Sequence, residues 1–280
     1  MKTHNFVVLA LLSLAVLQAT AQNRAIQVGY CTPLANLEAA KAAGFDYVEL
    51  STSEIAGLPD SDFDRALERI RQVGVPVPAS NLFLPAALKV TGPAIDRDQQ
   101  MAYVKKAFAR LQQIGITIVV FGSGGARQVP EGFPKDQAFQ QLVEFGRRIA
   151  PEARARGITV AVEPLRPQET NIINSAAEGL DLVNAIGDPN FQLMVDFYHL
   201  ASVKEDPAII LRARDHIRHL HMANPEGRVF PRTAQEYDYQ PFFAALRTIG
   251  YRGRISVEAS TKDLPGDAPP AIALLRNAFR

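Results

Sequence analysis

The chain has 280 residues, of which 47% are hydrophobic, and this content can bury one large core or at most two small ones. Its formal net charge of +1 leaves no surplus of basic residues, so neither nucleic acid nor an anionic membrane is an expected partner. The composition therefore favours a small-molecule ligand.

The first residues have the pattern of a secretory signal peptide. Lys2 precedes an apolar run over residues 6–17, and the sequence Ala-Thr-Ala at 19–21 supplies the small residues of a cleavage site. The run is shorter than the ~20 residues that cross a bilayer, which argues against an uncleaved anchor. We predict a signal peptide over residues 1–21, a mature domain over residues 22–280, and export to the periplasm or the medium without stable membrane insertion.

Short β-branched runs then alternate with longer amphipathic segments, which is typical of βα units and a parallel sheet. The expected strands are residues 26–30, 47–51, 77–83, 117–123, 159–165, 191–197, 217–223 and 254–260. The expected helices include residues 34–44, 62–74, 98–115, 138–157 and 241–250, each of which ends at a glycine. Eight such units predict a closed (β/α)8 TIM barrel. An open doubly wound sheet would need a glycine-rich turn after an early strand, and residues 28–31 have none.

Polar residues stand where the expected strands end. They are Glu49, Glu163, Asp196, His221 and Glu258, on the second, fifth, sixth, seventh and eighth strands. Active sites of such barrels form at the C-terminal ends of the strands, and side chains two positions apart share a face. We therefore expect these side chains to meet in the mouth of the barrel.

Carboxylates that converge in a buried mouth need a cation or shared protons. Glu163, Asp196, His221 and Glu258 form an oxygen-rich set with one imidazole, which suits Mn²⁺, Mg²⁺ or Co²⁺ better than a structural zinc site. The alternative is that each carboxylate lies in a separate structural ion pair. Their positions at the ends of neighbouring strands favour one shared site.

Four motifs resemble a known family. They are VEPLRPQETNIINS from Val162, VDFYH from Val195, HLHMANPEGR from His219 and VEAS from Val257. Together they resemble the xylose-isomerase-like sugar isomerases and epimerases, and most closely the ketose 3-epimerases that act on tagatose and psicose. The resemblance covers the eight βα units of the mature chain.

This resemblance implies one divalent ion, with Mn²⁺ favoured, on the four residues Glu163, Asp196, His221 and Glu258. It also implies that Glu163 and Glu258 are the acid and base of the reaction. Barrels of this kind often associate, so the resemblance also implies a possible homo-oligomer.

Four further residues are expected to contact a sugar substrate. The resemblance implies Glu169, His199 and Arg228, although a solvated loop cation is an equal alternative for Arg228. Glu49 rests only on its position near a strand end, and a bond to a neighbouring loop is the alternative.

Several other residues have plainer interpretations. We expect Cys31, the only cysteine, to be a small core residue. His219 is expected to be hydrogen-bonded inside the barrel. Phe83, Phe121 and Tyr198 could line a sugar pocket, but packing is the usual role of such aromatic residues. Asn81 has no assigned role.

The implied chemistry is abstraction of a proton alpha to a carbonyl, through an enediolate. Return of the proton to the opposite face epimerises the carbon, and return to the adjacent carbon isomerises the sugar. Loss of a β-oxygen makes the enzyme a lyase, and addition of water makes it a hydratase. Because export disfavours a phosphorylated substrate, we expect a neutral sugar or a keto-sugar, with an exported 3-keto-glycoside lyase or hydratase as the alternative. Asp196 and His221 argue against a metal-independent hydroxypyruvate-type isomerase.

Two alternatives come from other classes. A nuclease resembling endonuclease IV would need many histidines, and the mature chain has four, His199, His216, His219 and His221. A non-catalytic sugar-binding barrel would have little need for both Glu163 and Glu258. An isomerase or epimerase is therefore the favoured class.

Overall fold

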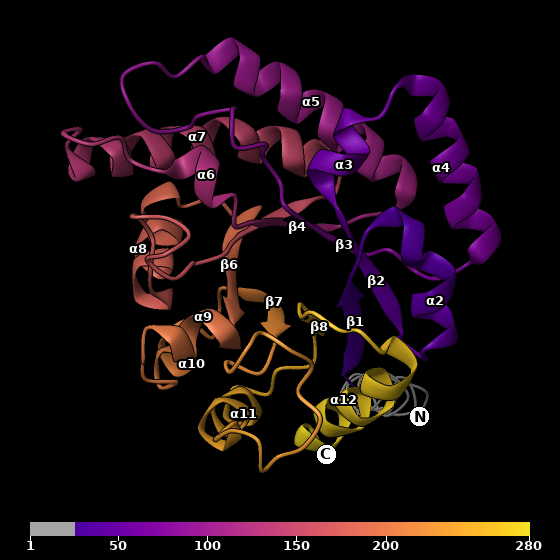
Figure 1. The fold of residues 1–280 in the computed structure, drawn as a ribbon. Coiled ribbons are helices and arrows are strands. Elements are labelled where there is room, and N and C mark those ends of the chain that lie inside the picture. Colours follow the sequence, from indigo (N-terminus) through magenta and orange to yellow (C-terminus); the bar gives the residue numbers. More distant parts are fainter. Residues whose placement is uncertain (1–25) are drawn as a thin grey trace, which may run out of the picture.

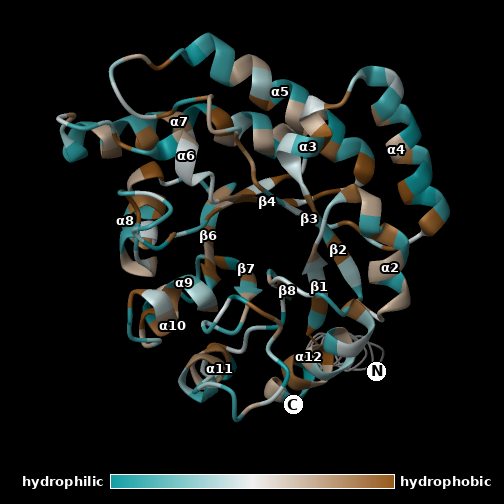
Figure 2. Ribbon diagram, in the orientation of Figure 1, coloured by the Kyte–Doolittle hydropathy of each residue, from teal (hydrophilic) through white to brown (hydrophobic). Residues whose placement is uncertain are grey.

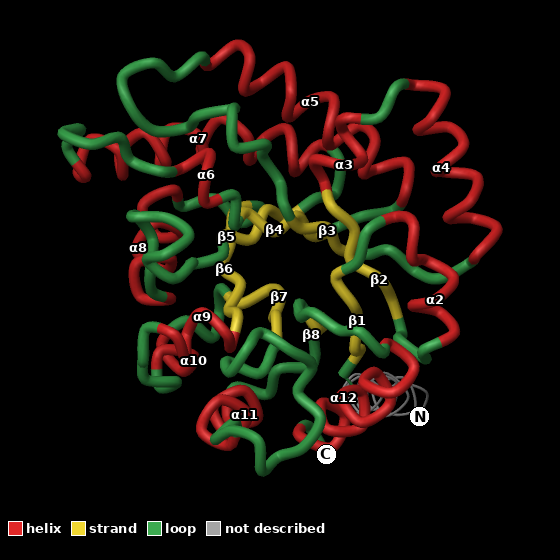
Figure 3. The backbone as a smooth tube through the Cα atoms, in the orientation of Figure 1, coloured by secondary structure: helices red, strands yellow, loops and turns green. Residues whose placement is uncertain are grey.

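The computed structural model describes residues 26–280, so the expected signal peptide lies outside the described residues. Eight parallel strands pair in chain order, and the last pairs with the first, which closes a barrel. Figure 3 shows this ring of strands inside a ring of helices. The strands are β1 (Gln27–Cys31), β2 (Tyr47–Ser51), β3 (Ala79–Asn81), β4 (Ile118–Phe121), β5 (Thr159–Val162), β6 (Phe191–Asp196), β7 (Ile217–Met222) and β8 (Arg254–Val257). The predicted TIM barrel is confirmed.

Helices follow the strands and cover the outside of the barrel (Figure 1). They are α2 (Leu37–Ala42), α3 (Thr52–Gly57), α4 (Asp60–Val73), α5 (Arg97–Ile114), α6 (Gly124–Arg127), α7 (Lys135–Ala155), α8 (Ala176–Ile186), α9 (Phe197–Ser202), α10 (Ile209–Arg212), α11 (Gln240–Thr248) and α12 (Leu264–Ala278), with a short 3-10 turn, η1 (Leu34–Asn36). Among the described residues, none of these helices combines the length and the apolar character that a membrane span requires.

Local sequence signals explain where several helices begin and end. The side chain of Asp96 accepts a hydrogen bond from the backbone N–H of Gln99, at 2.9 Å, and so caps the first turn of α5. Helices α4 and α5 stop at Gly74 and Gly115, which have φ angles of 68° and 95°. Glycine adopts this left-handed conformation without the steric penalty that a side chain brings.

Strand β3 is shorter than expected, covering Ala79–Asn81 rather than residues 77–83. Pro78 has no N–H to donate to a ladder, so it delays the start of the strand. Leu82 has a φ angle of 48°, which ends the extended conformation. The chain therefore turns away from the barrel directly after Asn81.

Two apolar regions hold the barrel together. The larger lies between the strands and the helices, and Figure 2 shows hydrophobic strands surrounded by helices that carry polar residues outward. The smaller consists of Ala79, Ile118, Val120, Ala161 and Met194, which lie on strands β3 to β6. It therefore belongs to one side of the barrel.

Gly29 tests how closely the barrel is packed. A Cβ atom on Gly29 would overlap the ring of buried Tyr47 on the neighbouring strand. We expect Gly29→Ala to lower the free energy of unfolding by ~1–3 kcal/mol, because overpacking forces neighbouring groups to move. Urea unfolding followed by circular dichroism measures this change.

Gly57, the last residue of α3, provides the matched control because no atom lies within 4 Å of the place that a Cβ would take there. Gly57→Ala should be neutral or stabilising by up to ~1 kcal/mol, since alanine has the higher helix propensity. Equal effects of the two substitutions would contradict the packing argument.

Candidate metal and substrate site

Four side chains meet at the C-terminal mouth of the barrel. Glu163 directly follows β5, Asp196 ends β6, His221 lies near the end of β7 and Glu258 directly follows β8. One donor atom from each residue lies within 4.8 Å of the other three. Nδ1 of His221 is 3.3 Å from Oε1 of Glu163 and 3.5 Å from Oε2 of Glu258. The structure thus brings together the four residues that the sequence proposed as one group.

The donor atoms of this group are suited to a cation. Oε1 of Glu163, Oδ2 of Asp196 and Nδ1 of His221 are buried, and none has a hydrogen-bond partner within residues 26–280. Burying an unpaired polar atom costs ~1–3 kcal/mol, so three at one point need an explanation. Carboxylate oxygens with one imidazole nitrogen fit a divalent ion such as Mn²⁺ or Mg²⁺. The residues present therefore form a candidate metal site.

The pKa values at this site reflect crowded negative charge. Burial, together with the charges of Glu163 and Glu258, raises the pKa of Asp196 to about 8. Burial and the charge of Glu258 also raise the pKa of Glu163. Burial opposes ionisation of Glu258 as well, but His221 and Arg228 lower its pKa to about 2. Without a metal, the site thus favours protonation of part of its carboxylates.

Glu258 is held by two neighbouring side chains. Nδ2 of Asn81, at the end of β3, donates to Oε1 of Glu258 at 3.0 Å, while Nη2 of Arg228 donates to Oε2 at 2.5 Å. The sequence left Asn81 without a role, although it ends a strand in the same way as the proposed ligands. The strand-end rule could therefore have included it.

A buried arginine holds the backbone of Glu163. Nη2 of Arg127 donates to the carbonyl oxygen of Glu163 at 2.6 Å, and Nη1 donates to that of Phe121 at 3.3 Å. Gly122 lies beside the Glu163 side chain, where a Cβ atom would overlap Oε2. Arg127 was not predicted from the sequence, because a charged residue in a short helix gives no periodic signal of burial.

His199 turns one ring nitrogen toward the site. Its Nδ1 accepts a hydrogen bond from the backbone N–H of Arg166 at 3.2 Å. Burial, helped by the charge of Arg228, lowers the pKa of His199 to about 3, so the ring is neutral at pH 7. The proton must then be on Nε2, which lies 3.6 Å from Oδ2 of Asp196. His199 therefore presents an N–H donor to whatever occupies the site.

Glu169 and Arg228 form the outer wall. Nη1 of Arg228 lies 3.3 Å from Oε1 of Glu169, and its guanidinium stacks 4.6 Å above the ring of Tyr198. The same Glu169 oxygen accepts from Nε of Arg166 at 2.8 Å. Tyr198 is itself buried, so it supports the arginine rather than forming an open pocket wall. Arg228 thus lies at the cavity wall against Glu169 and Glu258, with its side chain 30% exposed.

Glu49 corrects one expectation. It is the third of five residues in β2, its side chain is 0% exposed, and it lies behind the cavity wall rather than on it, deeper than its expected place at a strand end. Its carboxylate faces Nε2 of His221 at 3.0 Å and Nε2 of His219 at 2.8 Å. Burial opposes its ionisation, but His221 and His219 hold the pKa of Glu49 well below its usual range. The expectation that His219 is hydrogen-bonded inside the barrel is confirmed.

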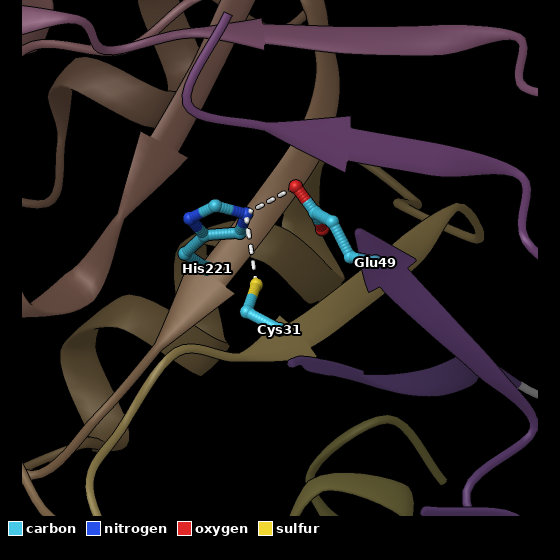
Figure 4. A group of neighbouring side chains, drawn as sticks. All are labelled: Cys31, Glu49 and His221. Carbon is cyan, nitrogen blue, oxygen red and sulfur yellow. Dashed lines mark hydrogen bonds and ion pairs between the residues drawn. The ribbon is translucent and has the colours of Figure 1, made fainter. Parts of the chain in front are cut away.

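Cys31 is a second correction, because it lines the cavity instead of belonging to the core. Figure 4 shows its sulfur beside His221, with Sγ 3.7 Å from Nε2. Cys31 is the last residue of β1, which ends at the cavity wall. Phe83 and Phe121, in contrast, are buried and pack against each other edge to face.

The site opens into a cavity of about 520 Å³. Its wall includes Cys31, Asn81, Glu163, Glu169, Arg228 and Glu258. Its charged lining residues are four glutamates and one arginine, the remaining glutamate being Glu54. This negative wall disfavours a strongly anionic ligand.

The structure is a closed eight-stranded TIM barrel with a candidate metal site at its C-terminal mouth. Residues 37–278 match the model of the xylose isomerase-like TIM barrel. The chain belongs to this family, and its distant relatives are ketose 3-epimerases.

One curated relative and two solved structures illustrate the similarity, the structures at the level of the fold. The L-ribulose 3-epimerase of Methylomonas sp. (strain DH-1) is 29% identical over 241 residues, which cover 80% of this chain and 77% of the relative. The D-psicose 3-epimerase of Clostridium cellulolyticum H10, solved with D-tagatose, shares the fold with a TM-score of 0.81 at 20% identity, covering 91% of this chain and 100% of that one. The 3-keto-D-glucoside 4-epimerase YcjR of E. coli has a TM-score of 0.75 at 19% identity, covering 90% and 99%.

Asp196 provides a test of the crowded charge in metal-free protein. Its pKa is raised to about 8 in the folded state, against ~3.9 in an unfolded chain. Between pH ~4 and pH ~8, the folded protein keeps a proton on Asp196 that the unfolded chain has released. The contribution of Asp196 to stability therefore falls as the pH rises through this range. The amide introduced by Asp196→Asn has no proton to release, and its oxygen can still accept from the N–H of Tyr198.

We therefore expect Asp196→Asn to be more stable than wild type in EDTA, with a difference that grows by more than ~1 kcal/mol between pH 5 and pH 8. Urea unfolding at both pH values measures it. Asp64→Asn, at an exposed position on α4, is the control and should give no such pH-dependent difference. A difference that is independent of pH would contradict the argument.

Proposed function

We propose that the protein is a divalent-metal-dependent epimerase that acts on a ketose or keto-sugar through an enediolate. The observation that carries this proposal is the placement of two carboxylates, Glu163 and Glu258, around one candidate cation site. Their oxygens lie 3.3 Å and 3.5 Å from the same nitrogen of His221, and both residues line the same cavity. The family membership and the 3-epimerase relatives support the reaction class.

The two carboxylates suit a transfer of one proton across a carbon. One glutamate removes the proton alpha to the carbonyl, and the other donates a proton from the opposite face, which inverts the centre. A divalent ion held by Glu163, Asp196, His221 and Glu258 supplies Lewis-acid stabilisation of the oxygen that becomes negative. We favour Mn²⁺, with Mg²⁺ or Co²⁺ as alternatives, because the donor set is rich in oxygen.

Other residues are placed to hold the substrate. The N–H of His199 Nε2 can donate to a sugar oxygen, since this nitrogen is buried and has no partner within the described chain. Arg228 can donate to a hydroxyl or carbonyl oxygen, and Glu169 can accept from a hydroxyl. His199 lies beside Asp196 and Glu169, and Arg228 lies beside Glu258.

The cavity favours an uncharged sugar. A phosphate group carries about −2 charge at pH 7. Apart from the proposed metal ligands, the charged residues of the cavity wall are Glu54, Glu169 and Arg228, so the wall has no surplus of cations to hold a phosphate. We therefore propose a free ketose or a keto-sugar rather than a sugar phosphate.

A 3-keto-glycoside lyase or hydratase is the second candidate. The cavity volume of about 520 Å³ falls within the ~300–1,000 Å³ of pockets that hold drug-sized ligands, so a sugar with a substituent fits. One glutamate would remove the alpha proton, and the other would donate a proton to the β-oxygen as its bond to carbon breaks. A sugar-binding barrel without catalysis is the candidate from another class.

Hydrogen exchange at the substrate separates these candidates. With Mn²⁺ or Mg²⁺ in D₂O, we expect deuterium to enter the position alpha to the carbonyl of at least one ketohexose or 3-keto-glucoside, as followed by NMR. The incorporation should stop with EDTA and return with metal. An inverted product identifies an epimerase, and loss of the substituent identifies a lyase. Bound metal without incorporation into any substrate would contradict a catalytic role.

The acid and base roles can be tested separately. We expect Glu163→Gln and Glu258→Gln each to lower the rate of epimerisation by at least ~10²-fold, because an amide cannot transfer the proton. If the residues act on opposite faces, each variant should still exchange the alpha proton of only one of the two epimers. Metal binding is measured in parallel, because both residues are proposed ligands. Unchanged epimerisation by Glu258→Gln would remove it from the mechanism.

We also propose that the protein is exported and that its mature form begins near Gln22. The support is the charged, apolar and small-residue pattern of residues 1–21. We expect intact-mass analysis of the protein from a bacterial secretion fraction to show a chain that lacks these residues. A full-length chain that stays in the cytoplasmic fraction would contradict this proposal.

A further inference from the structure

A buried polar network lies directly behind the candidate metal group. Its members come from β2, β7 and β8, and each is at most 1% exposed; they are Tyr47, Glu49, His219, His221 and Ser256. Only His221 belongs to both the network and the group of proposed metal ligands. Its imidazole therefore connects the two layers.

Glu49 is the acceptor at the centre of this network. Its Oε1 lies 3.0 Å from Nε2 of His221, and its Oε2 lies 2.8 Å from Nε2 of His219. The hydroxyl of Ser256 donates to Oε2 at 2.6 Å. An ionised carboxylate only accepts hydrogen bonds, so each of these histidine nitrogens must carry a proton.

This arrangement fixes the role of each nitrogen of His221. Figure 4 shows one ring nitrogen turned toward Glu49 and Cys31 and the other turned away from them. The second nitrogen, Nδ1, is the one that lies 3.3 Å from Glu163 and 3.5 Å from Glu258. A metal-binding imidazole nitrogen must be unprotonated, and a neutral ring with a proton on Nε2 leaves Nδ1 free.

We propose that Glu49 is a positioning residue that holds His221 with Nε2 protonated and Nδ1 directed at the metal. This inference rests on the metal site of the proposed function and extends it to a residue one layer deeper. Sulfur of Cys31, 3.7 Å from the same Nε2, is a weak acceptor that cannot replace the carboxylate.

The chemistry of the network requires a carboxylate at position 49. His219 and His221 both present N–H donors, and an amide offers only one accepting atom. In Glu49→Gln, one histidine would therefore face an NH₂ group and would have to turn or change its tautomer. The substitution keeps the size of the side chain, so its main effect should be on the hydrogen bonds.

The first experiment measures Mn²⁺ binding by isothermal titration calorimetry. We expect Glu49→Gln to bind Mn²⁺ roughly 10- to 100-fold more weakly than wild type, the usual effect of losing the carboxylate behind a histidine ligand. Tyr47→Phe is the matched control. This substitution removes the hydrogen bond between the hydroxyl of Tyr47 and Oγ of Ser256, at 2.8 Å in the same buried network. It does not alter the contact of His221 with Glu49, so the affinity of this variant for Mn²⁺ should stay near that of wild type.

The second experiment reads the tautomer directly. Ring ¹⁵N NMR of the wild-type protein with Mg²⁺, which is diamagnetic, should show His221 protonated on Nε2 and not on Nδ1. In Glu49→Gln, His221 should no longer be protonated on Nε2 alone, whereas in Tyr47→Phe it should keep this tautomer. This spectrum of the wild type decides the question even if the Glu49 variant does not fold.

The outcomes separate the inference from the proposed function. Wild-type protein that binds neither Mn²⁺ nor Mg²⁺ would overturn the metal site and the role of Glu49 together. Metal binding by the wild type with equal affinity in Glu49→Gln, or a proton on Nδ1 of His221 in the metal-bound wild type, would overturn only the positioning role. An equal loss of affinity in Tyr47→Phe would also overturn it, because any disturbance of the network would then be sufficient.

Discussion

Repulsion among buried carboxylates is the constraint on which the mouth of this barrel depends. Glu163, Asp196 and Glu258 share a space where little water is available to screen their charges, and the chain opposes them there with His221 and Arg228. Burial, together with the charges of Glu163 and Glu258, still raises the pKa of Asp196 to about 8 in the presence of these two groups. A divalent cation would balance the negative charge, and it would use the donor atoms that have no partner within residues 26–280.

The rest of the site can be understood as support against this repulsion. Parallel strands bring the carboxylates to one end of the barrel. Arg127 holds the backbone beside Glu163, and Asn81 holds the side chain of Glu258. Glu49, one layer deeper than the carboxylates, contacts Nε2 of His221 and so orients its ring toward the candidate metal site.

The sequence was most informative where a local rule connects position to geometry. A strand end places a side chain at the mouth, which correctly grouped Glu163, Asp196, His221 and Glu258. The same rule failed for Glu49, because β2 continues for two residues beyond it and leaves it one layer deeper. It was not applied to Asn81, although β3 ends there. Cys31 was assigned to the core because small apolar residues are usually buried, whereas its strand ends at the cavity wall.

The sequence by itself determined the barrel, the order of its strands and the candidate ligands, because strand periodicity, helix caps and strand ends are properties of neighbouring residues. Only the tertiary structure decided which groups support those ligands. Glu49 and His221 are 172 positions apart, and Asn81 and Glu258 are 177 apart, so no local pattern joins them. Closure of the barrel brings these residues within hydrogen-bond distance, and burial then determines which of them are charged and which nitrogen of each histidine carries the proton.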